Sequence, residues 1–302
     1  IRIAVNYDPR IIQDTIHHVH PNLMCCVPRF WEKVYVAVRS KLAGMNRLQR
    51  VMVSHALRIG HRRNLHYRRL GLKVPRLLEM RYRFWDRRLF AVVKRNIGIP
   101  NPNMFPTAGA PLSDRIAEFF LSIGIDIKIG YGLSETTATV SCFPDVGYEI
   151  GTVGVPLPGL DVKISDEGEI LVKGPTVTRG YYKNAEANAQ AFTPDGYFRT
   201  GDAGYLTPSG ALVLTERIKD LFKTANGKYI APQALESHLA ETKYIDEVAV
   251  IGEGRKYVSA LIVPNFPNLR RWADSHHISY ADTAELLASP KVQDFMMSCV
   301  EE

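Results

Sequence analysis

Long hydrophobic runs are missing from this sequence. A transmembrane helix needs about 18 or more consecutive apolar residues, and no uncharged apolar run of about that length occurs. The opening residues, Ile1 to Val5, also lack the apolar segment and small-residue cleavage site of a signal peptide. We therefore expect a cytoplasmic protein that does not span a bilayer.

Cysteine is scarce. The four cysteines stand at positions 25, 26, 142 and 299, and neither a CxxC pair nor a Cys/His spacing suited to zinc is present. The neighbours Cys25 and Cys26 cannot form a disulfide with each other without strain. Because they lie in the apolar run Leu23 to Val27, we expect reduced, buried thiols on a core strand.

Acidic residues are almost absent between Lys41 and Pro100. Sixteen lysines and arginines are opposed there by only Glu79 and Asp86, so this segment carries +14 while the whole chain carries +7. Apolar residues recur between the charges at intervals of three and four, which predicts amphipathic helices with breaks near Gly60 and Gly71.

The basic segment has several interpretations. A basic helical face suits an anionic membrane, a nucleic acid or an anionic ligand, and it also occurs as a solvated surface. No recognised nucleic-acid-binding module is present in the sequence, so we expect no nucleic-acid partner. Peripheral contact with an anionic membrane and a plain solvated face remain as alternatives.

The chain is long enough for two or three domains. Residues 1–146, which include the basic segment 41–100, alternate predicted helices and strands, such as a helix opened by Ser113 and a strand over Ile125 to Ile129. Residues 147–218 consist of short alternating runs separated by turns, which predicts a β subdomain. Residues 219–302 return to an α/β pattern, so a boundary is expected close to Lys219.

The first segment that carries chemistry runs from Gly130 to Thr137, directly after a predicted strand. Ligands of α/β proteins bind at such strand ends. Tyr131 offers a flat face for stacking, Ser134 offers a hydroxyl, and Glu135 offers a carboxylate suited to Mg²⁺ beside a phosphate. The Gly-x-Gly pair alone is a weak signal.

Two further segments follow. In Tyr197 to Asp202, an aspartate after a tight glycine turn can accept two hydrogen bonds, as a ribose diol requires, although a turn-capping role is the alternative. The segments Thr215 to Asp220 and Lys223 to Pro232 combine alternating charges with a glycine turn at the expected boundary. Each of these patterns also occurs on ordinary protein surfaces.

Taken in this order, the segments resemble the adenylate-forming superfamily of acyl-CoA synthetases, luciferases and peptide-synthetase adenylation domains. The segment Ala108 to Ser113 is similar to the family's adenine-binding segment, and Gly168 to Asn184 to its β-subdomain signature. Residues 179–202 and 223–232 look most like long-chain fatty acid CoA ligases. The implied fold is α/β: a large domain of α/β layers with a small β-barrel-like unit, followed by a smaller α/β domain.

The resemblance also implies roles for individual residues. Ser134 would touch the α-phosphate of ATP, Glu135 would hold Mg²⁺, and Lys219 would be the hinge between an adenylating and a thioester-forming pose. The remaining residues would contact nucleotide or coenzyme A: Gly109, Ala110 and Tyr131 around the adenine, Asp202 at the ribose hydroxyls, Arg217 between ribose and phosphate, and Gly227 along the pantetheine channel.

The implied reaction joins a fatty acid to coenzyme A at the expense of ATP, through an acyl adenylate, with release of AMP and pyrophosphate. No protein nucleophile is required. One alternative is a ligase that passes the acyl group to a carrier protein, and another is a non-catalytic lipid- or membrane-binding relative.

The sequence departs from the family pattern in three places. Ser134 stands where the family usually has threonine, which keeps the hydroxyl. The Ser/Thr/Gly-rich phosphate loop and the adenylation lysine have no counterpart in the sequence. We therefore expect the central part of a longer protein, or a sequence from which segments have been dropped.

Overall fold

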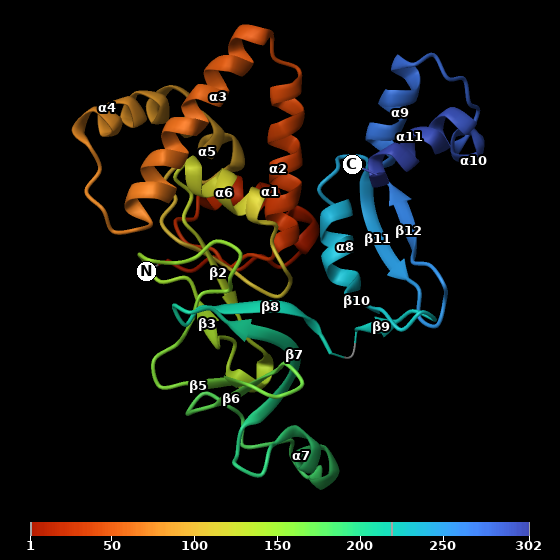
Figure 1. Ribbon diagram of the computed structural model, residues 1–302. Coiled ribbons are helices and arrows are strands. Elements are labelled where there is room, and N and C mark those ends of the chain that lie inside the picture. The colour runs from red at the N-terminus through yellow and green to blue at the C-terminus, as the bar shows by residue number, and fades with distance from the viewer. Residues whose placement is uncertain (1, 219, 302) are drawn as a thin grey trace. The chain divides into compact units, whose positions relative to one another are not determined.

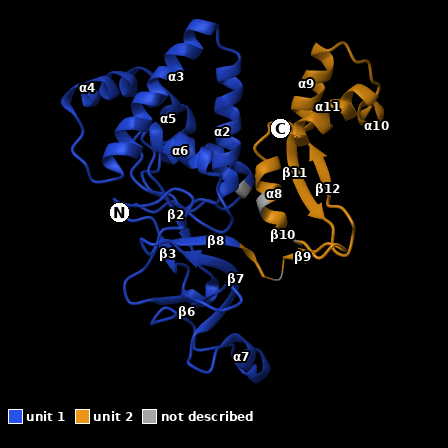
Figure 2. Cartoon of the chain, viewed as in Figure 1, with its two compact units in different colours: residues 1–215 blue, residues 216–302 orange. Residues whose placement is uncertain are grey.

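The computed structural model describes residues 2–218 and 220–301. The chain divides into two compact units, residues 1–215 and 216–302 (Figure 2). The division falls a few residues before Lys219, which itself lies outside the described residues. Within the described part of the chain, no helix is both long and apolar enough to cross a membrane.

The first unit contains a four-stranded sheet in the order β1-β2-β3-β4. Its strands are β1 (Phe105–Thr107), β2 (Ile127–Tyr131), β3 (Ser141–Cys142) and β4 (Val155–Pro156). β1 and β2 are parallel, and they are joined by helix α6 (Asp114–Ser122), as the predicted helix after Ser113 requires. The other two pairings are antiparallel.

Helices form a layer beside this sheet (Figure 1). In chain order they are α1 (Ile12–Val19), α2 (Pro28–Ala43), α3 (Arg47–His61), α4 (Arg76–Trp85) and α5 (Ala91–Ile97). The basic segment is helical, as predicted, but the first break is not at Gly60. That glycine lies inside α3, and a π-helical stretch over Arg62–Arg68 follows it. A second π-helix, Asp86–Phe90, joins α4 to α5.

Trp31 is the centre of the core between helices and sheet. It is fully buried, and its ring centroid lies 5.6 Å from that of Phe105 in β1 and 4.8 Å from that of Phe120 in α6. Its indole Nε1 donates a hydrogen bond of 2.9 Å to the Thr107 hydroxyl. Burying aromatic rings of this size contributes on the order of 2 kcal/mol each, which fixes α2 against the sheet.

The sequence predicted a core strand over Leu23 to Val27, but no regular strand forms there. Only single bridges to β1 form there, Leu23 with Met104 and Cys26 with Thr107. Leu23, Cys25 and Val27 are exposed, and Cys26 is half-buried. The segment borders the sheet as an edge, where alternate side chains face outward, so the expected burial of both thiols is wrong for Cys25.

The second sheet of the first unit has the order β5-β6-β7-β8. Its strands are β5 (Asp161–Ile164), β6 (Glu169–Lys173), β7 (Phe198–Leu206) and β8 (Leu212–Arg217), and α7 (Ala185–Ala191) lies between β6 and β7 in the chain. β6 is antiparallel to both β5 and β7. A small core joins this sheet to the end of β2, and it consists of Tyr131, Val140, Ile170, Val172 and Leu212.

The second unit contains two antiparallel strand pairs and four helices among its described residues. The pairs are β9 (Phe222–Lys223) with β10 (Tyr229–Ile230), and β11 (Ile245–Ile251) with β12 (Ser259–Pro264). The helices are α8 (Pro232–Leu239), α9 (Phe266–Ser275), α10 (Thr283–Ala288) and α11 (Pro290–Glu301). Leu269, Ala273, Leu286 and Val292 form its helical core.

Candidate active site

Two loops leave the same edge of the first sheet. Because β1 and β2 are parallel, with Thr107 opposite Ile129, the segments that follow them emerge side by side. Gly109 and Ala110 follow β1 and are exposed. Gly109 has φ of 96°, which favours glycine, and no atom lies within 4 Å of the position that a Cβ would take. This stretch is therefore open backbone accessible to a ligand.

The loop after β2 is held tightly by its own backbone. A Cβ on Gly132 would lie 2.0 Å from the Ala138 carbonyl oxygen, so only glycine fits there. The buried Thr136 hydroxyl accepts a hydrogen bond of 3.0 Å from the Leu133 backbone N–H, which closes a single 3₁₀ turn over Ser134–Thr136. This turn leaves Ser134 exposed and Glu135 half-buried.

Tyr131 and Asp202 meet in the space between the two sheets of the first unit. The Tyr131 hydroxyl donates a hydrogen bond of 2.7 Å to Asp202 Oδ2, and each residue is only 7% exposed. The Tyr131 ring packs in the small core that joins the sheets. A phenol that donates to a buried carboxylate stabilises the charged form and fixes its orientation.

An irregularity in β7 aims Asp202 toward Tyr131. Glu169 pairs with Ala203 and Leu171 with Arg199, so the register shifts between these two pairs. Gly201 has φ of 71°, and its N–H donates to Glu169 Oε1 at 2.9 Å. Bulges of this kind re-aim side chains beside functional sites. Residues Phe198 to Asp202 of the predicted motif therefore lie within a bulged strand.

Glu135 has a partner that the sequence did not reveal. The Tyr181 hydroxyl donates a hydrogen bond of 3.0 Å to Glu135 Oε1, and the Glu135 backbone carbonyl accepts one of 2.7 Å from the Thr178 N–H. Partial burial, and then the contact with Glu135, raises the pKa of Tyr181, so the phenol stays a neutral donor at neutral pH. In the sequence, only the position of Tyr181 within the β-subdomain signature, Gly168 to Asn184, pointed to this residue.

The side chains near Glu135 limit how many protein ligands a metal ion can have there. Among residues 2–218 and 220–301, no three His, Cys, Asp or Glu side chains gather into a metal-binding cluster. Mg²⁺ commonly uses one or two carboxylates and takes its remaining ligands from phosphates and water. One half-exposed carboxylate on a fixed turn fits an ion that arrives with a nucleotide.

The remaining predicted residues belong to the second unit. Arg217 is the last residue of β8 and is exposed. Gly227 lies in the turn between β9 and β10, where its φ is 81° and its N–H donates to the Thr224 carbonyl at 2.9 Å. A left-handed turn of this kind favours glycine. Lys219 lies outside the described residues.

Comparison with protein families decides the assignment. The model of the AMP-binding enzyme family matches residues 2–182, and that of the AMP-binding enzyme C-terminal domain matches residues 219–286. The chain belongs to the AMP-binding enzyme family. Asp202 and Arg217 lie between the two matched ranges, and the hydrogen bond to Tyr131 connects Asp202 to the first of them.

Curated relatives of this AMP-binding enzyme include fatty acid ligases. It is 34% identical over 242 residues to the long-chain-fatty-acid–CoA ligase FadD15 of Mycobacterium tuberculosis, which covers 80% of this chain and 39% of the relative. It is 26% identical over 307 residues to the peroxisomal long chain acyl-CoA synthetase 7 of Arabidopsis thaliana, which covers 96% and 42%. The chain thus spans about two fifths of these relatives' length.

Solved structures share the fold. The adenylation domain of a carboxylate reductase from Mycobacterium chelonae superposes with a TM-score of 0.66 at 21% identity, covering 98% of this chain and 41% of that one. O-succinylbenzoate coenzyme A synthetase from Bacillus subtilis gives a TM-score of 0.55 at 19% identity, covering 93% and 46%. These similarities confirm the predicted α/β adenylate-forming fold with its smaller C-terminal domain.

Proposed function

We propose that this AMP-binding enzyme forms part of a long-chain fatty acid CoA ligase, which activates a fatty acid with ATP as an acyl adenylate and transfers it to coenzyme A. The 34% identity to a long-chain-fatty-acid–CoA ligase is the observation that carries the proposal. The bond between Tyr131 and Asp202 supports it, because it joins two motifs of the nucleotide site.

In the first half-reaction, a carboxylate oxygen of the fatty acid attacks the α-phosphorus of ATP while the bond to pyrophosphate breaks. Two anions must approach each other, so catalysis depends on positioning and on charge neutralisation. Mg²⁺ bound with ATP would supply positive charge. Asp202, held by Tyr131, orients the ribose; Ser134 contacts the α-phosphate; and Glu135, held by Tyr181, is the protein's metal ligand.

In the second half-reaction, the coenzyme A thiol attacks the acyl carbon, a thioester forms, and AMP leaves with the electron pair of the broken anhydride. Residues of the second unit serve this step in the proposal. Gly227, in the exposed turn between β9 and β10, lines the pantetheine channel, Arg217 contacts the nucleotide, and Lys219 is the hinge.

Fatty acid, ATP and coenzyme A are the proposed substrates, and Mg²⁺ the proposed metal. A cytoplasmic location is also part of the proposal, with any membrane contact peripheral. Gly109 and Ala110 are assigned to the adenine. The Tyr131 ring, which was expected to stack on the adenine, is largely buried, so this proposal assigns Tyr131 a different role: its hydroxyl orients Asp202.

The test uses the full-length enzyme and follows both half-reactions. Pyrophosphate release that depends on added fatty acid, measured across several chain lengths, tests adenylation. Acyl-CoA formation with coenzyme A, compared with acyl transfer to a carrier-protein thiol, tests the acceptor. Release that does not depend on fatty acid would contradict the proposal, and transfer to a carrier protein alone would replace coenzyme A as the acceptor.

A further inference from the structure

The outer face of α4 carries an apolar stripe. Leu77, Met80 and Phe84 are 63%, 61% and 53% exposed, and they recur at intervals of three and four residues. They lie on the side of the helix opposite Tyr82, which is buried. A single exposed apolar residue is ordinary on a protein surface, whereas a contiguous row of such residues is not. An apolar stripe of this kind therefore indicates a contact surface.

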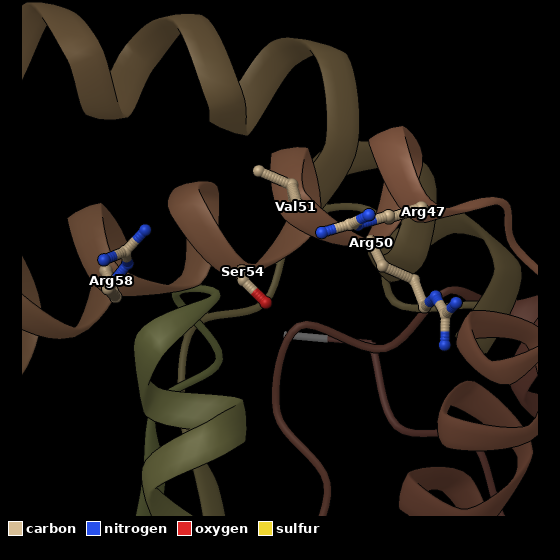
Figure 3. A pocket seen from close by; sticks show the side chains of 5 residues that line it. All are labelled: Arg47, Arg50, Val51, Ser54 and Arg58. Atoms are coloured by element: carbon tan, nitrogen blue, oxygen red, sulfur yellow. The ribbon is translucent and has the colours of Figure 1, made fainter.

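The outer face of α3 carries a shallow, open hollow lined by basic side chains, which we call the basic groove. Arg47, Arg50 and Arg58 line it together with Val51 and Ser54, and its volume is about 320 Å³. Figure 3 shows these side chains on successive turns of the helix. All five are exposed, and they lie away from Ala56 and Ile59, which α3 buries in the core. The groove therefore presents guanidinium groups and one hydroxyl to solvent.

The arginines of the groove are not neutralised by neighbouring acids. Glu79 accepts two hydrogen bonds from Arg63, at 2.7 and 3.1 Å, and one from Arg83. Asp86 accepts one of 2.7 Å from Lys94. These contacts use both acids of residues 41–100, and no described carboxylate forms an ion pair with a groove arginine.

The stripe and the groove lie on neighbouring helices of one layer. His55 of α3 contacts α4 twice: its Nε2 is 3.1 Å from Arg81 Nη2, and its ring centroid is 6.1 Å from that of Trp85. Arg88 stands above the Phe84 ring, with its guanidinium carbon 5.6 Å from the centroid. A cationic side chain thus lies directly beside the apolar stripe of α4, and Figure 1 shows α3 and α4 as separate helices of this layer.

We propose that α3 and α4 form a docking surface for a bilayer that contains anionic phospholipids. Cationic groups would contact lipid phosphates, and Leu77, Met80 and Phe84 would enter the boundary between headgroups and acyl chains. A duplex nucleic acid would satisfy the arginines but would leave the apolar stripe in water, so the lipid surface fits better. The proposal does not rest on the ligase activity.

The test measures binding of the full-length protein to vesicles of phosphatidylcholine with and without phosphatidylglycerol. The variant Arg47→Glu, Arg50→Glu, Arg58→Glu should weaken partitioning onto anionic vesicles by about 100-fold at low salt. A matched control reverses three exposed cations of the second unit, Lys256, Arg271 and Lys291, and changes the net charge equally. This control should bind nearly as well as the parent.

A second variant separates insertion from charge attraction. This variant carries Leu77→Gln, Met80→Gln and Phe84→Gln, and glutamine is a good helix former. It should bind anionic vesicles at low salt as the parent does, but it should lose the vesicle binding that the parent keeps at high salt. Circular dichroism and thermal melting verify that each variant folds. Vesicles should also protect α3 and α4 from hydrogen exchange more than the rest of the first unit.

Three outcomes would overturn the proposal. One is equal binding to neutral and anionic vesicles, and another is an equal loss in both charge-reversal variants. The third is full protection of α3 and α4 from hydrogen exchange in the free full-length protein, with no further protection when vesicles are added. This result would mean that another part of the protein covers the two helices. Binding to a DNA duplex that equals vesicle binding and is lost in the same variant would assign the surface to nucleic acid instead.

Discussion

Tyr131 and Asp202 are 71 residues apart in the sequence, and the Tyr131 hydroxyl donates a buried hydrogen bond of 2.7 Å to the Asp202 carboxylate. The bond ties the end of β2 to the bulge in β7 and so links two sheets of the first unit. A nucleotide site that uses Asp202 therefore depends on Tyr131 for the orientation of its carboxylate.

Asp202→Ala should raise the KM for ATP by about 10- to 100-fold, because hydrogen bonds to a charged group contribute about 1.5–3 kcal/mol. ATP and dATP should then have similar KM values. Asp195→Ala, which removes an exposed carboxylate from a turn of the same β unit, is the matched control and should leave both values unchanged. A variant that prefers ATP as strongly as the parent would refute the ribose assignment.

Tyr131→Phe should lower the free energy of unfolding by about 1–3 kcal/mol, since a buried carboxylate then loses a donor. It should also raise the KM for ATP several-fold. In the Asp202→Ala background the same change should have little further effect on KM, because both variants remove one interaction. Additive effects on KM would mean that Tyr131 acts independently of Asp202.

Glu135→Ala should reduce pyrophosphate release more than tenfold at saturating Mg²⁺, while fatty acid binding is unchanged, because metal-assisted neutralisation contributes several kcal/mol in the transition state. A smaller loss would remove Glu135 from the metal site.

Tyr181→Phe should weaken the apparent Mg²⁺ affinity by about tenfold, since a partner that orients a metal ligand is lost. Tyr182→Phe is the matched control: its side chain is 88% exposed, and it should leave the Mg²⁺ dependence as in the parent. If both variants shift the Mg²⁺ dependence equally, the hydrogen bond to Glu135 has no role in metal binding.

Lys219→Pro should retain adenylation and lose most acyl-CoA formation, because proline fixes φ near −65° where a domain rotation needs backbone freedom. Separate assays of the two half-reactions measure this. Lys219→Ala removes the charge but leaves φ free, and it should reduce thioester formation much less. Equal losses in both half-reactions of the proline variant would indicate local unfolding.

The adjacent cysteines should differ in reactivity. Burial raises the pKa of Cys26 to about 12, with a further contribution from the neighbouring Cys25, whereas Cys25 is exposed. The thiolate is the nucleophile, so alkylation of the folded protein at pH 8 should modify Cys25 at least about 100-fold faster than Cys26. Peptide mass spectrometry after timed alkylation measures both rates, and equal rates would show that the 23–27 segment opens in solution.

Local sequence patterns determined most of the secondary structure. The strand predicted over Ile125 to Ile129 is β2 at Ile127–Tyr131, and the helix predicted after Ser113 is α6. Such elements depend on the periodicity and turn residues of a few neighbours, which the sequence contains in full. The order of the sequence motifs was likewise sufficient to indicate the family, which the AMP-binding enzyme match confirms.

Tertiary structure decided which distant groups meet and which faces are buried. Periodicity shows that α4 has an apolar side, but only packing decides that Tyr82 faces the core while Leu77, Met80 and Phe84 face solvent. The contact between Tyr181 and Glu135 depends on how two loops pack, and the one between Tyr131 and Asp202 depends on the register and bulge of β7. Strand register joins residues far apart in the chain, so no local window of the sequence determines it.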